Sequence, residues 1–318
     1  MENNHCEPAT KPTLYFIGVT TSKSSIMNLF PKWAEYLRLG DCEIKGFDFM
    51  LHDETAKYLE CVEFIKKDPL SKVALITTHK IDIFLSCADQ FDYLDEHSTT
   101  MGEISCISKD GNKLLGHAKD PISSDLALNR ILPEDYWKEK DGEVLCLGAG
   151  GAAISILYNL NRQRQQANHP SKIFVTDIRK SRLEYIQKIY RKFDKNIPIE
   201  LHQCSEIKNN DELTTNLKPH SLIINATGLG KDKPGSPFTW DVQYPQNSIV
   251  WELNYRGELI FLDQAESQRN KKNLTIHDGW IYFIHGWLEV IAEVFQMEIK
   301  NSGDYFENLS EIACSIRK

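Results

Sequence analysis

The chain has 318 residues, of which 41% are hydrophobic and 26% charged, and its formal net charge is −8 at pH 7. This length allows two domains of ordinary size, each with its own core, and the composition is that of a soluble globular protein. The negative charge argues against a nucleic-acid binder and against a protein that docks on anionic membranes. No apolar run approaches the roughly 18 residues of a membrane-spanning helix, and no signal peptide opens the chain.

The eight cysteines are scattered, none forms a C-x-x-C pair, and most lie within apolar or helical patterns. We interpret them as reduced thiols that serve as small hydrophobic side chains, which favours a cytoplasmic protein. No grouping of cysteine and histidine has the spacing of metal ligands, so we expect no metal site. The cysteines are Cys6, Cys42, Cys61, Cys87, Cys106, Cys146, Cys204 and Cys314.

The first part of the chain alternates between strand patterns and helix patterns. Such alternation predicts a mainly parallel sheet covered by helices. Strands are expected over residues 14–19, 42–49 and 72–77, and helices over residues 25–39 and 54–67.

A domain boundary is expected near residues 116–121, after which a connecting helix runs from Asp125 to about Leu132. We predict an α/β fold with two domains. The first is a mainly parallel substrate-binding domain, residues 1–119, completed by C-terminal helices in residues 278–318. The second is a Rossmann-type, doubly wound dinucleotide domain, residues 120–277. The expected strands of the second domain are 143–147, 172–176, 198–203, 221–225 and 248–253, and the expected helices are 152–166, 180–193 and the strongly apolar 280–296.

A glycine-rich turn follows the strand at residues 143–147 and leads directly into a helical pattern. In a dinucleotide-binding turn of the form G-x-G-x-x-A, Gly148 permits the bend, Gly150 lets the backbone approach a pyrophosphate, and Ala153 keeps helix and strand close. The next strand ends at Asp177, whose carboxylate can accept hydrogen bonds from a ribose diol and would repel a 2′-phosphate. The alternative is a structural turn in an α/β domain that binds no nucleotide.

Three polar groups follow predicted strands or mark the predicted domain junction. Ser22 and Ser24 lie near a helix start and favour a carboxylate receptor; helix capping by Ser24 or Ser25 is the alternative, and both can hold together. Lys80 is expected at the carboxyl edge of the sheet, where ligands bind in open α/β folds, although most lysines are solvated surface charges. Asp120 lies at the predicted junction of the two domains.

The chain resembles the shikimate dehydrogenase family in a series of segments that follow the family's order over most of its length. Ser22-Lys23-Ser24 is similar to the family's S-K-S motif for the substrate carboxylate, Lys80 falls on the lysine of N-V-T-x-P-x-K, and Asp120 falls on the aspartate of L-x-G-x-N-T-D. The other similar segments are the glycine turn at 148–153, Asn225-Ala226-Thr227-Gly228-Leu229-Gly230 with N-A-T-x-x-G, Glu252 and Tyr255 with D-x-x-Y, and Asp278-Gly279 with the start of D-G-x-x-M-L-x-x-Q.

The resemblance implies a hydride transfer between a nicotinamide cofactor and a carboxylated cyclic alcohol or ketone. Lys80 and Asp120 would manage the proton, because a desolvated lysine beside a carboxylate can stabilise alkoxide charge and exchange a proton. The implied substrate-binding residues are Ser22, Ser24, Ser105, Tyr255 and His285. The implied cofactor-binding residues are Gly148, Ala149, Gly150, Gly151, Ala152, Asp177, Arg179, Thr227, Gly228 and Gly230.

Several side chains with which the family reads ring hydroxyls are replaced in this chain. Each lost hydrogen bond would cost a polyol substrate about 1 kcal/mol or more, so we expect a substrate that differs from shikimate. The replacements are Ala74, Ile76 and Thr78 in N-V-T-x-P-x-K, Ser105 in G-A-x-N-T, Ala118 and Lys119 before Asp120, and Gly286 for the glutamine of the last helix, beside His285.

Cofactor and function each have alternatives. Many family members carry N-R-T after the second nucleotide strand, and its arginine grips the 2′-phosphate of NADP. Asp177-Ile178-Arg179 stands there in this chain and favours NAD, although Arg179 and Lys180 could partly restore phosphate binding.

A true shikimate or quinate dehydrogenase with an altered pocket is one alternative, and a regulatory protein that senses a ligand without turnover is another. The retained Lys80 and Asp120 argue against the sensor. We expect a monomer or homodimer whose partner is a small molecule.

Overall fold

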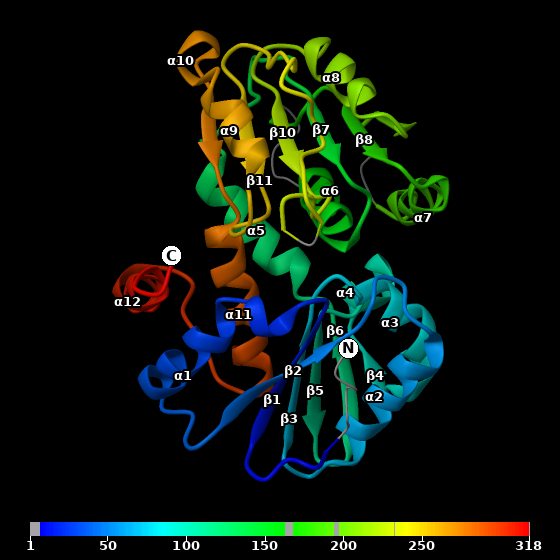
Figure 1. Ribbon diagram of the computed structural model, residues 1–318, viewed down its shortest axis with the longest axis vertical. Helices are drawn as coiled ribbons and strands as arrows, with labels where there is room; N and C mark the ends of the chain where they lie inside the picture. The colour runs from blue at the N-terminus through cyan, green and yellow to red at the C-terminus, as the bar shows by residue number, and fades with distance from the viewer. Residues whose placement is uncertain (1–6, 163–167, 194–196, 232, 318) are drawn as a thin grey trace. The chain divides into compact units, whose positions relative to one another are not determined.

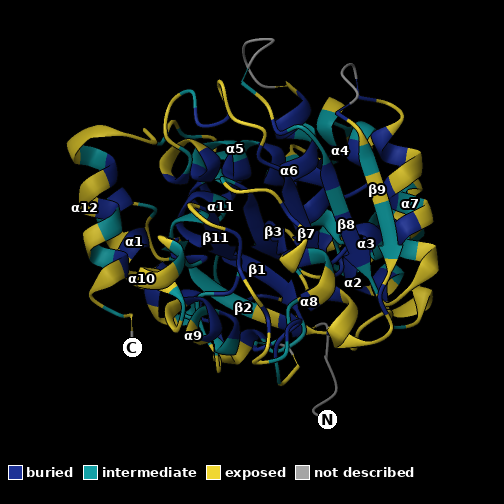
Figure 2. Cartoon of the chain, turned by 90° about the horizontal axis from the view of Figure 1, so that it is seen from above, coloured by how far each residue is buried: buried dark blue, intermediate teal, exposed yellow. Residues whose placement is uncertain are grey.

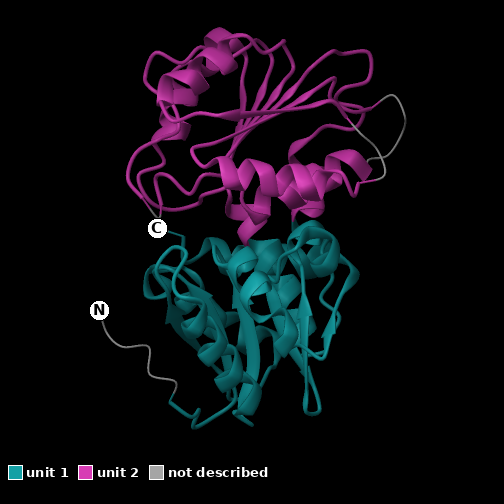
Figure 3. Cartoon of the chain, turned by 90° about the vertical axis from the view of Figure 1, so that its right-hand side faces the viewer, with its two compact units in different colours: residues 1–123, 284–318 teal, residues 124–283 magenta. Residues whose placement is uncertain are grey.

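The computed structural model describes residues 7–162, 168–193, 197–231 and 233–317. The chain forms two compact units (Figure 3). Unit 1 contains residues 1–123 and 284–318, and unit 2 contains residues 124–283. The boundaries expected from the sequence lie at residues 119/120 and 277/278. The expected helix over 152–166 extends onto residues 163–167, and these residues, like Cys6, lie outside the described ones.

Unit 1 is built on a sheet with strand order β2-β1-β3-β5-β6-β4 (Figure 1). The pairs β1–β2, β1–β3 and β4–β6 are parallel, whereas β3–β5 and β5–β6 are antiparallel. The mainly parallel sheet predicted for this part is therefore confirmed, with an antiparallel hairpin added to it. Its elements are β1 (Thr13–Gly18), η1 (Thr21–Lys23), α1 (Ile26–Leu37), β2 (Glu43–Asp48), α2 (Thr55–Lys67), β3 (Ser71–Ile76), α3 (Lys80–Cys87), η2 (Ala88–Gln90), β4 (Tyr93–Leu94), α4 (Glu96–Met101), β5 (Cys106–Asp110), β6 (Lys113–His117) and α12 (Gly303–Cys314).

Unit 2 is built on a sheet with strand order β12-β11-β10-β7-β8-β9, in which every pair is parallel. The order reverses at β7, whose neighbours are β10 and β8, so this is the doubly wound sheet predicted from the sequence. Its elements are β7 (Val144–Leu147), α6 (Gly151–Arg162), β8 (Ile173–Asp177), α7 (Lys180–Tyr190), β9 (Ile199–Gln203), α8 (Ile207–Thr215), β10 (Leu222–Asn225), β11 (Ile249–Glu252), α9 (Ile260–Glu266), α10 (Arg269–Lys272) and β12 (Thr275–His277).

Two helices continue from one unit into the other. Helix α5 (Asp120–Ile131) begins in unit 1, and α11 (Trp280–Val294) begins in unit 2 and continues in unit 1 from Ile284. The prediction that the connecting helix begins at Asp125 was wrong, because it begins at Asp120. Pro121 does not stop this helix, since proline is tolerated in a first helical turn, where its missing N–H costs no hydrogen bond.

The strands supply the core of each unit. All residues of β1, β7, β10 and β11 are buried, as expected for strands covered on both faces. Figure 2 shows this as dark blue strands, with the exposed faces of helices such as α12 in yellow. No helix among the described residues is long and apolar enough to cross a membrane.

Helices α1 and α12 are tied together inside unit 1 by Trp33. This side chain is fully buried, and its indole N–H donates to the carbonyl oxygen of Leu309 at 3.0 Å. Phe306 and Leu309 are also buried on α12, so the helix packs through one apolar face.

Trp33→Phe should therefore lower the free energy of unfolding by about 2 kcal/mol, through the lost hydrogen bond and the unfilled volume. Urea unfolding followed by circular dichroism measures the change. The matched control is Trp240→Phe, because Trp240 is 65% exposed. Equal effects of the two substitutions would contradict this account of the α1–α12 contact.

Candidate active site

Lys80 is the first residue of α3 and follows β3 after only three residues. It therefore lies beyond the carboxyl end of a buried strand, as predicted. The connection is tightly bent: Thr78 has φ 60°, and the His79 N–H donates to the Thr77 carbonyl. A β-branched residue in the left-handed region costs on the order of 1–3 kcal/mol, and such strain clusters at functional sites. The family proline at this position requires a negative φ, so the backbone here differs from the family pattern.

The structure pairs Lys80 with Asp120. The Lys80 Nζ donates to Asp120 Oδ2, and the two side chains are only 15% and 9% exposed. Asp120 is held at the start of α5, where the Ser123 hydroxyl donates to its carbonyl oxygen at 3.3 Å. Both residues belong to unit 1, so the pair does not depend on how the units are placed.

Burial alone would lower the pKa of Lys80, but the charges of Asp120 and Glu103 and the hydrogen bond to Asp120 act in the opposite direction. The net result is a pKa above the ordinary value for lysine. Lys80 is therefore a cation at neutral pH, and it is suited to stabilise negative charge on a substrate oxygen or to donate a proton to it.

Glu103 is a second acidic residue close to this lysine, and our sequence analysis did not single it out. It is fully buried and follows α4 after Gly102, while the N–H of its neighbour Ile104 donates to the carbonyl of Lys80 at 3.1 Å. The sequence offered one signal: a glutamate stands where the family motif G-A-x-N-T has alanine. The lysine is thus acted on by two carboxylates.

A partly buried ionic network adjoins the dyad through Lys119. Its Nζ donates to Glu293 Oε2 on α11 at 2.6 Å, and Glu293 Oε1 lies 3.3 Å from His117 Nε2. Ser108 Oγ is 2.8 Å from the same ring nitrogen, and Asp95 Oδ2 is 3.5 Å from His117 Nδ1. Lys119 replaces a threonine of the family motif, and its charge is neutralised by the protein itself.

The Ser22-Lys23-Ser24 segment forms the short helix η1 and the turn after it. The backbone N–H of Thr21 donates to Asp48 Oδ1 at 2.7 Å, which holds the turn against the end of β2. Ser22 is exposed and Ser24 is 5% exposed. Ser25 is the N-cap of α1 but makes no capping hydrogen bond through its side chain, so capping by Ser25 does not explain this segment.

The remaining predicted substrate residues lie in different surroundings. Ser105 is 2% exposed, and its hydroxyl oxygen accepts from the N–H of Lys119 at 2.7 Å. His285 is also 2% exposed and stacks on Phe306, with ring centroids 4.7 Å apart. Tyr255 belongs to unit 2 and contacts Phe283 at 4.3 Å between ring centroids. The roles of these three residues in substrate binding stay predictions.

The glycine turn has the backbone that the sequence predicted. Gly148 has φ 99°, and a Cβ added there would lie 2.7 Å from the carbonyl oxygen of Ala226, so a side chain does not fit. A Cβ on Gly150 would meet nothing within 4 Å, which leaves open space above the turn. Gly151 then begins α6, whose first N–H groups carry the positive end of the helix dipole. These residues fit a dinucleotide pyrophosphate.

Asp177 lies at the end of β8, beside this turn. Its Oδ2 accepts from the N–H of Ala149 at 3.0 Å, and its Oδ1 accepts from the N–H of Arg179 at 2.8 Å. A carboxylate has further acceptor sites, so these two bonds leave capacity for a ribose hydroxyl. The Arg179 side chain is 44% exposed, and its Nε lies 3.8 Å from Asp177 Oδ1. Ala152 continues α6 directly after Gly151.

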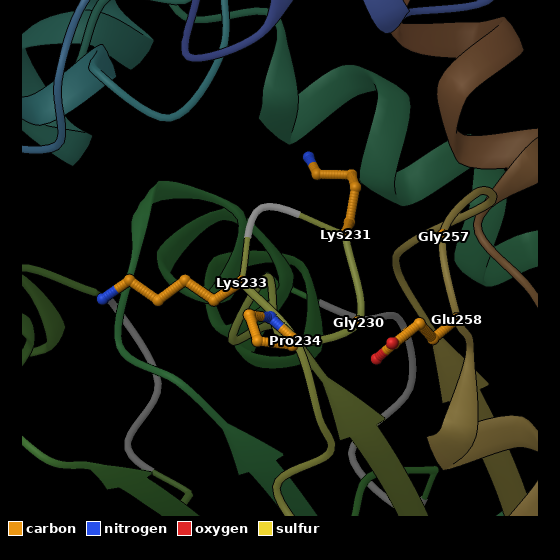
Figure 4. Close-up of a pocket in the computed structure, with 6 residues that line it drawn as sticks. All are labelled: Gly230, Lys231, Lys233, Pro234, Gly257 and Glu258. Atoms are coloured by element: carbon orange, nitrogen blue, oxygen red, sulfur yellow. The ribbon is translucent and has the colours of Figure 1, made fainter.

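The Asn225–Gly230 loop follows β10 and contains Thr227 and Gly228. Gly228 and Gly230 have φ 75° and 87°, which favours glycine at both positions. A pocket beside the loop is lined by Gly230, Lys231, Lys233, Pro234, Gly257 and Glu258. Figure 4 shows the side chains of Lys231 and Lys233 extending in different directions. Lys231 and Lys233 therefore do not form a common anion site.

Glu252 is a fully buried acid at the end of β11. Its carboxyl group accepts from Asn225 Nδ2 at 2.6 Å and from the N–H of Asn254 at 2.8 Å. Burial raises the pKa of Glu252 to about 8, although these hydrogen bonds and the charge of Lys231 lower it. Glu252 falls on a family motif, but the sequence indicated no role for it. Among the described residues, no group of three histidine, cysteine or acidic side chains is arranged to hold a metal ion.

No protein-family model matches the chain. It is 26% identical over 220 residues to the shikimate dehydrogenase (NADP(+)) of Caldicellulosiruptor saccharolyticus, which covers 68% of this chain and 70% of that protein. The crystal structure of shikimate dehydrogenase from Aquifex aeolicus superposes with a TM-score of 0.69 at 20% identity, over 97% of this chain and 99% of that one. Quinate dehydrogenase from Corynebacterium glutamicum in complex with NAD gives a TM-score of 0.69 at 16% identity, over 96% and 99% of the chains. The two structures establish the likeness of fold.

The raised pKa of Glu252 predicts a pH-dependent stability. An unfolded chain ionises this group near its ordinary pKa, whereas the folded chain holds it neutral up to about pH 8. Its contribution is therefore fully present below about pH 4 and is lost as the pH rises to 8, by on the order of 4 kcal/mol. Glu252→Gln should remove this slope in urea unfolding measured from pH 5 to 9. An unchanged slope would contradict the assignment.

Proposed function

We propose that the chain, which is similar to shikimate dehydrogenases in sequence and fold, is a nicotinamide-dependent oxidoreductase that interconverts a carboxylated cyclic alcohol and its ketone. The observation that carries this proposal is the Lys80–Asp120 pair, a protonated lysine held beside a carboxylate at the carboxyl end of a buried strand. A protein that only senses a ligand has no need of a proton-transfer pair, and the retained pair argues for turnover.

Lys80 handles the substrate proton in this mechanism. In alcohol oxidation, the neutral Nζ of Lys80 accepts the proton of the hydroxyl group, and the carbon that carries this group loses a hydride. In ketone reduction, the protonated Nζ donates a proton to the carbonyl oxygen, which becomes the hydroxyl group of the alcohol. The bound nicotinamide supplies the hydride acceptor or donor. Asp120 orients Nζ and stabilises its positive charge. Since the pKa of Lys80 is raised, oxidation becomes faster as the pH rises and reduction is favoured nearer neutrality.

The substrate class follows from the groups that are kept and from those that are replaced. Ser22 and Ser24, in the turn fixed by Asp48, would bind the carboxylate. The side chains with which the family binds ring hydroxyls are replaced here. Ala74 has no polar side chain, and the Ser105 hydroxyl already accepts a hydrogen bond from the protein backbone. We therefore propose a carboxylated ring with fewer or differently placed hydroxyls than shikimate. A true shikimate or quinate dehydrogenase is the alternative that a substrate panel distinguishes.

The cofactor is a nicotinamide dinucleotide, and within that class we propose NAD. Gly148, Gly150 and Gly151 would hold the pyrophosphate and Asp177 the adenosine ribose, while the Thr227–Gly230 loop would lie at the nicotinamide end. The Caldicellulosiruptor relative is named for NADP(+), whereas the quinate dehydrogenase structure contains NAD. Asp177 and the exposed Ile178 stand where an arginine would contact the 2′-phosphate of NADP, which supports NAD here.

Lys80→Ala tests the mechanism. With cyclic hydroxy acids, including shikimate and quinate, assayed with NAD and NADP, wild-type protein should turn over at least one compound. The substitution should lower kcat by at least about a hundredfold, because it removes the proton-transfer group. Lys67→Ala is the matched control, since Lys67 is an exposed lysine on α2 paired with Glu63. Full activity in the Lys80 variant would sink the mechanism, and binding of nucleotide without any turnover would favour the sensor.

Asp177→Asn tests the cofactor assignment by calorimetric titration of each dinucleotide. Asparagine keeps an acceptor for the Ala149 N–H but loses the charge that repels a 2′-phosphate. The ratio of the NAD and NADP affinities should fall by at least about fivefold, whereas Asp141→Asn, on an exposed residue paired with Lys218, should leave it unchanged. Tighter binding of NADP than NAD by the wild-type protein would show the NAD assignment to be wrong.

A further inference from the structure

A closed ring of hydrogen bonds holds the Asn225–Gly230 loop in unit 2. It starts at Asn225, the last residue of β10, and returns through β11 to the same residue. Every contact in the ring joins residues of unit 2, so its geometry belongs to that unit alone. The ring lies where β10 and β11 end, and it joins their last residues to the loop that follows β10.

The loop side of the ring runs through Thr227. Asn225 Oδ1 accepts from the N–H of Thr227 at 3.1 Å and from its hydroxyl at 2.6 Å. The Thr227 hydroxyl oxygen in turn accepts from the N–H of Leu229 at 3.1 Å. These bonds fold the loop back on the end of β10, and they use the only acceptor atom of the Asn225 side chain.

Glu252 closes the ring from the neighbouring strand. Because the Asn225 oxygen faces Thr227, its Nδ2 must face an acceptor, and Glu252 Oε2 lies 2.6 Å from it. Glu252 Oε1 accepts from the N–H of Asn254 at 2.8 Å, and Asn254 Nδ2 donates to the carbonyl of Leu229 at 2.9 Å. Asn225 and Glu252 are partners in the β10–β11 register, and both are fully buried. A buried amide left without its acceptor is costly, so the ring specifies one loop conformation.

The far end of the loop is fixed by close backbone contact. The N–H of Glu258 donates to the carbonyl oxygen of Gly230 at 2.8 Å. A Cβ added to Gly257 would lie 1.8 Å from that oxygen, so the two segments meet where only glycine fits. The loop is thus held at Gly230 by backbone and at Asn225–Leu229 by the ring.

We infer that Glu252 is a positioning residue for the cofactor: its carboxyl group fixes the Asn225–Gly230 loop, through Asn225 and Asn254, in the shape that receives the nicotinamide half of the dinucleotide. This inference rests on the proposed function, because the nicotinamide end of the site is assigned to this loop there. Glu252 acts through the loop and has no contact of its own with the cofactor.

The choice of glutamate supports the assignment. The family motif D-x-x-Y has aspartate here, and aspartate is shorter by one methylene, or about 1.5 Å of reach. The hydrogen bonds of Glu252 with Asn225 and Asn254 are 2.6 and 2.8 Å long, so an aspartate on the same backbone would be too short to make both. Burial raises the pKa of Glu252, so this position disfavours the ionised carboxylate.

Hydrogen exchange in the protein without cofactor tests the ring directly. Glu252→Ala should speed exchange of the Thr227 and Leu229 amides by at least about tenfold, since their hydrogen bonds lose support, while amides of β7 stay protected. Glu252→Gln keeps one acceptor and should give an intermediate rate. Glu200→Gln is the matched control, because Glu200 lies on β9 and pairs with Lys172. If Glu252→Ala does not fold, the comparison of amide exchange is made between Glu252→Gln and the wild-type protein.

Calorimetric titration with NAD and NADP completes the experiment. The dissociation constant of the better cofactor should rise by at least about tenfold in Glu252→Ala and change less than twofold in Glu200→Gln. Wild-type exchange in the Glu252 variants would overturn the inference, and so would faster exchange with unchanged affinity. If wild-type protein binds neither dinucleotide, the proposed function fails; the exchange rates then still show whether Glu252 fixes the loop.

Discussion

The buried pair of Lys80 and Asp120 is the interaction on which the candidate active site depends. A lysine that is 15% exposed is tolerable only beside a carboxylate, and removing either partner would leave a buried charge without compensation. The fold brings the two together from β3–α3 and from the start of α5, which lie 40 residues apart in sequence. Two local features accommodate this: the left-handed Thr78 before Lys80, and Pro121 in the first turn after Asp120.

Near this pair in unit 1, polar side chains that differ from the family motifs form hydrogen bonds and ion pairs within the protein. Lys119 and Ser105 occupy positions where the family motifs have hydroxyl or amide side chains for a ligand. In this protein Lys119 pairs with Glu293, and Ser105 accepts from the Lys119 backbone. Such groups stabilise the protein and no longer have all their hydrogen-bonding capacity for a substrate. These side chains therefore form an internal hydrogen-bond and ion-pair network, and that network is the structural basis for proposing a ligand that differs from shikimate.

Sequence patterns predicted the parts of the fold whose periodicity is strong. The buried strands β1, β3, β7 and β10 and the glycine turn were found because continuous apolar runs and glycine spacing are local signals. Lys80 was singled out because it follows a predicted strand, and Asp120 because it lies at the predicted domain junction and matches a family motif. Helix α3 was missed, since it is only eight residues long, and the β5–β6 hairpin was missed because Ser108 and Lys109 break its apolar alternation. Glu103 and Glu293 could not be found by pattern, because their importance comes from neighbours distant in sequence.

Each unit contains a buried acidic residue, Glu103 in unit 1 and Glu252 in unit 2, and the two have different surroundings. Asp120 and, to a smaller extent, Glu103 raise the pKa of Lys80, whereas Glu252 is bonded to two asparagines and burial raises its own pKa. In the structure, Glu252 contacts other protein groups, and Glu103 lies close enough to Lys80 to raise the pKa of that lysine. A motif match records only residue type at a position, so it cannot tell a group that touches the substrate from one that positions such a group. For Glu252 that distinction required the hydrogen-bond partners. Glu103 and Glu252 both depart from the family motifs, which have alanine and aspartate at these positions.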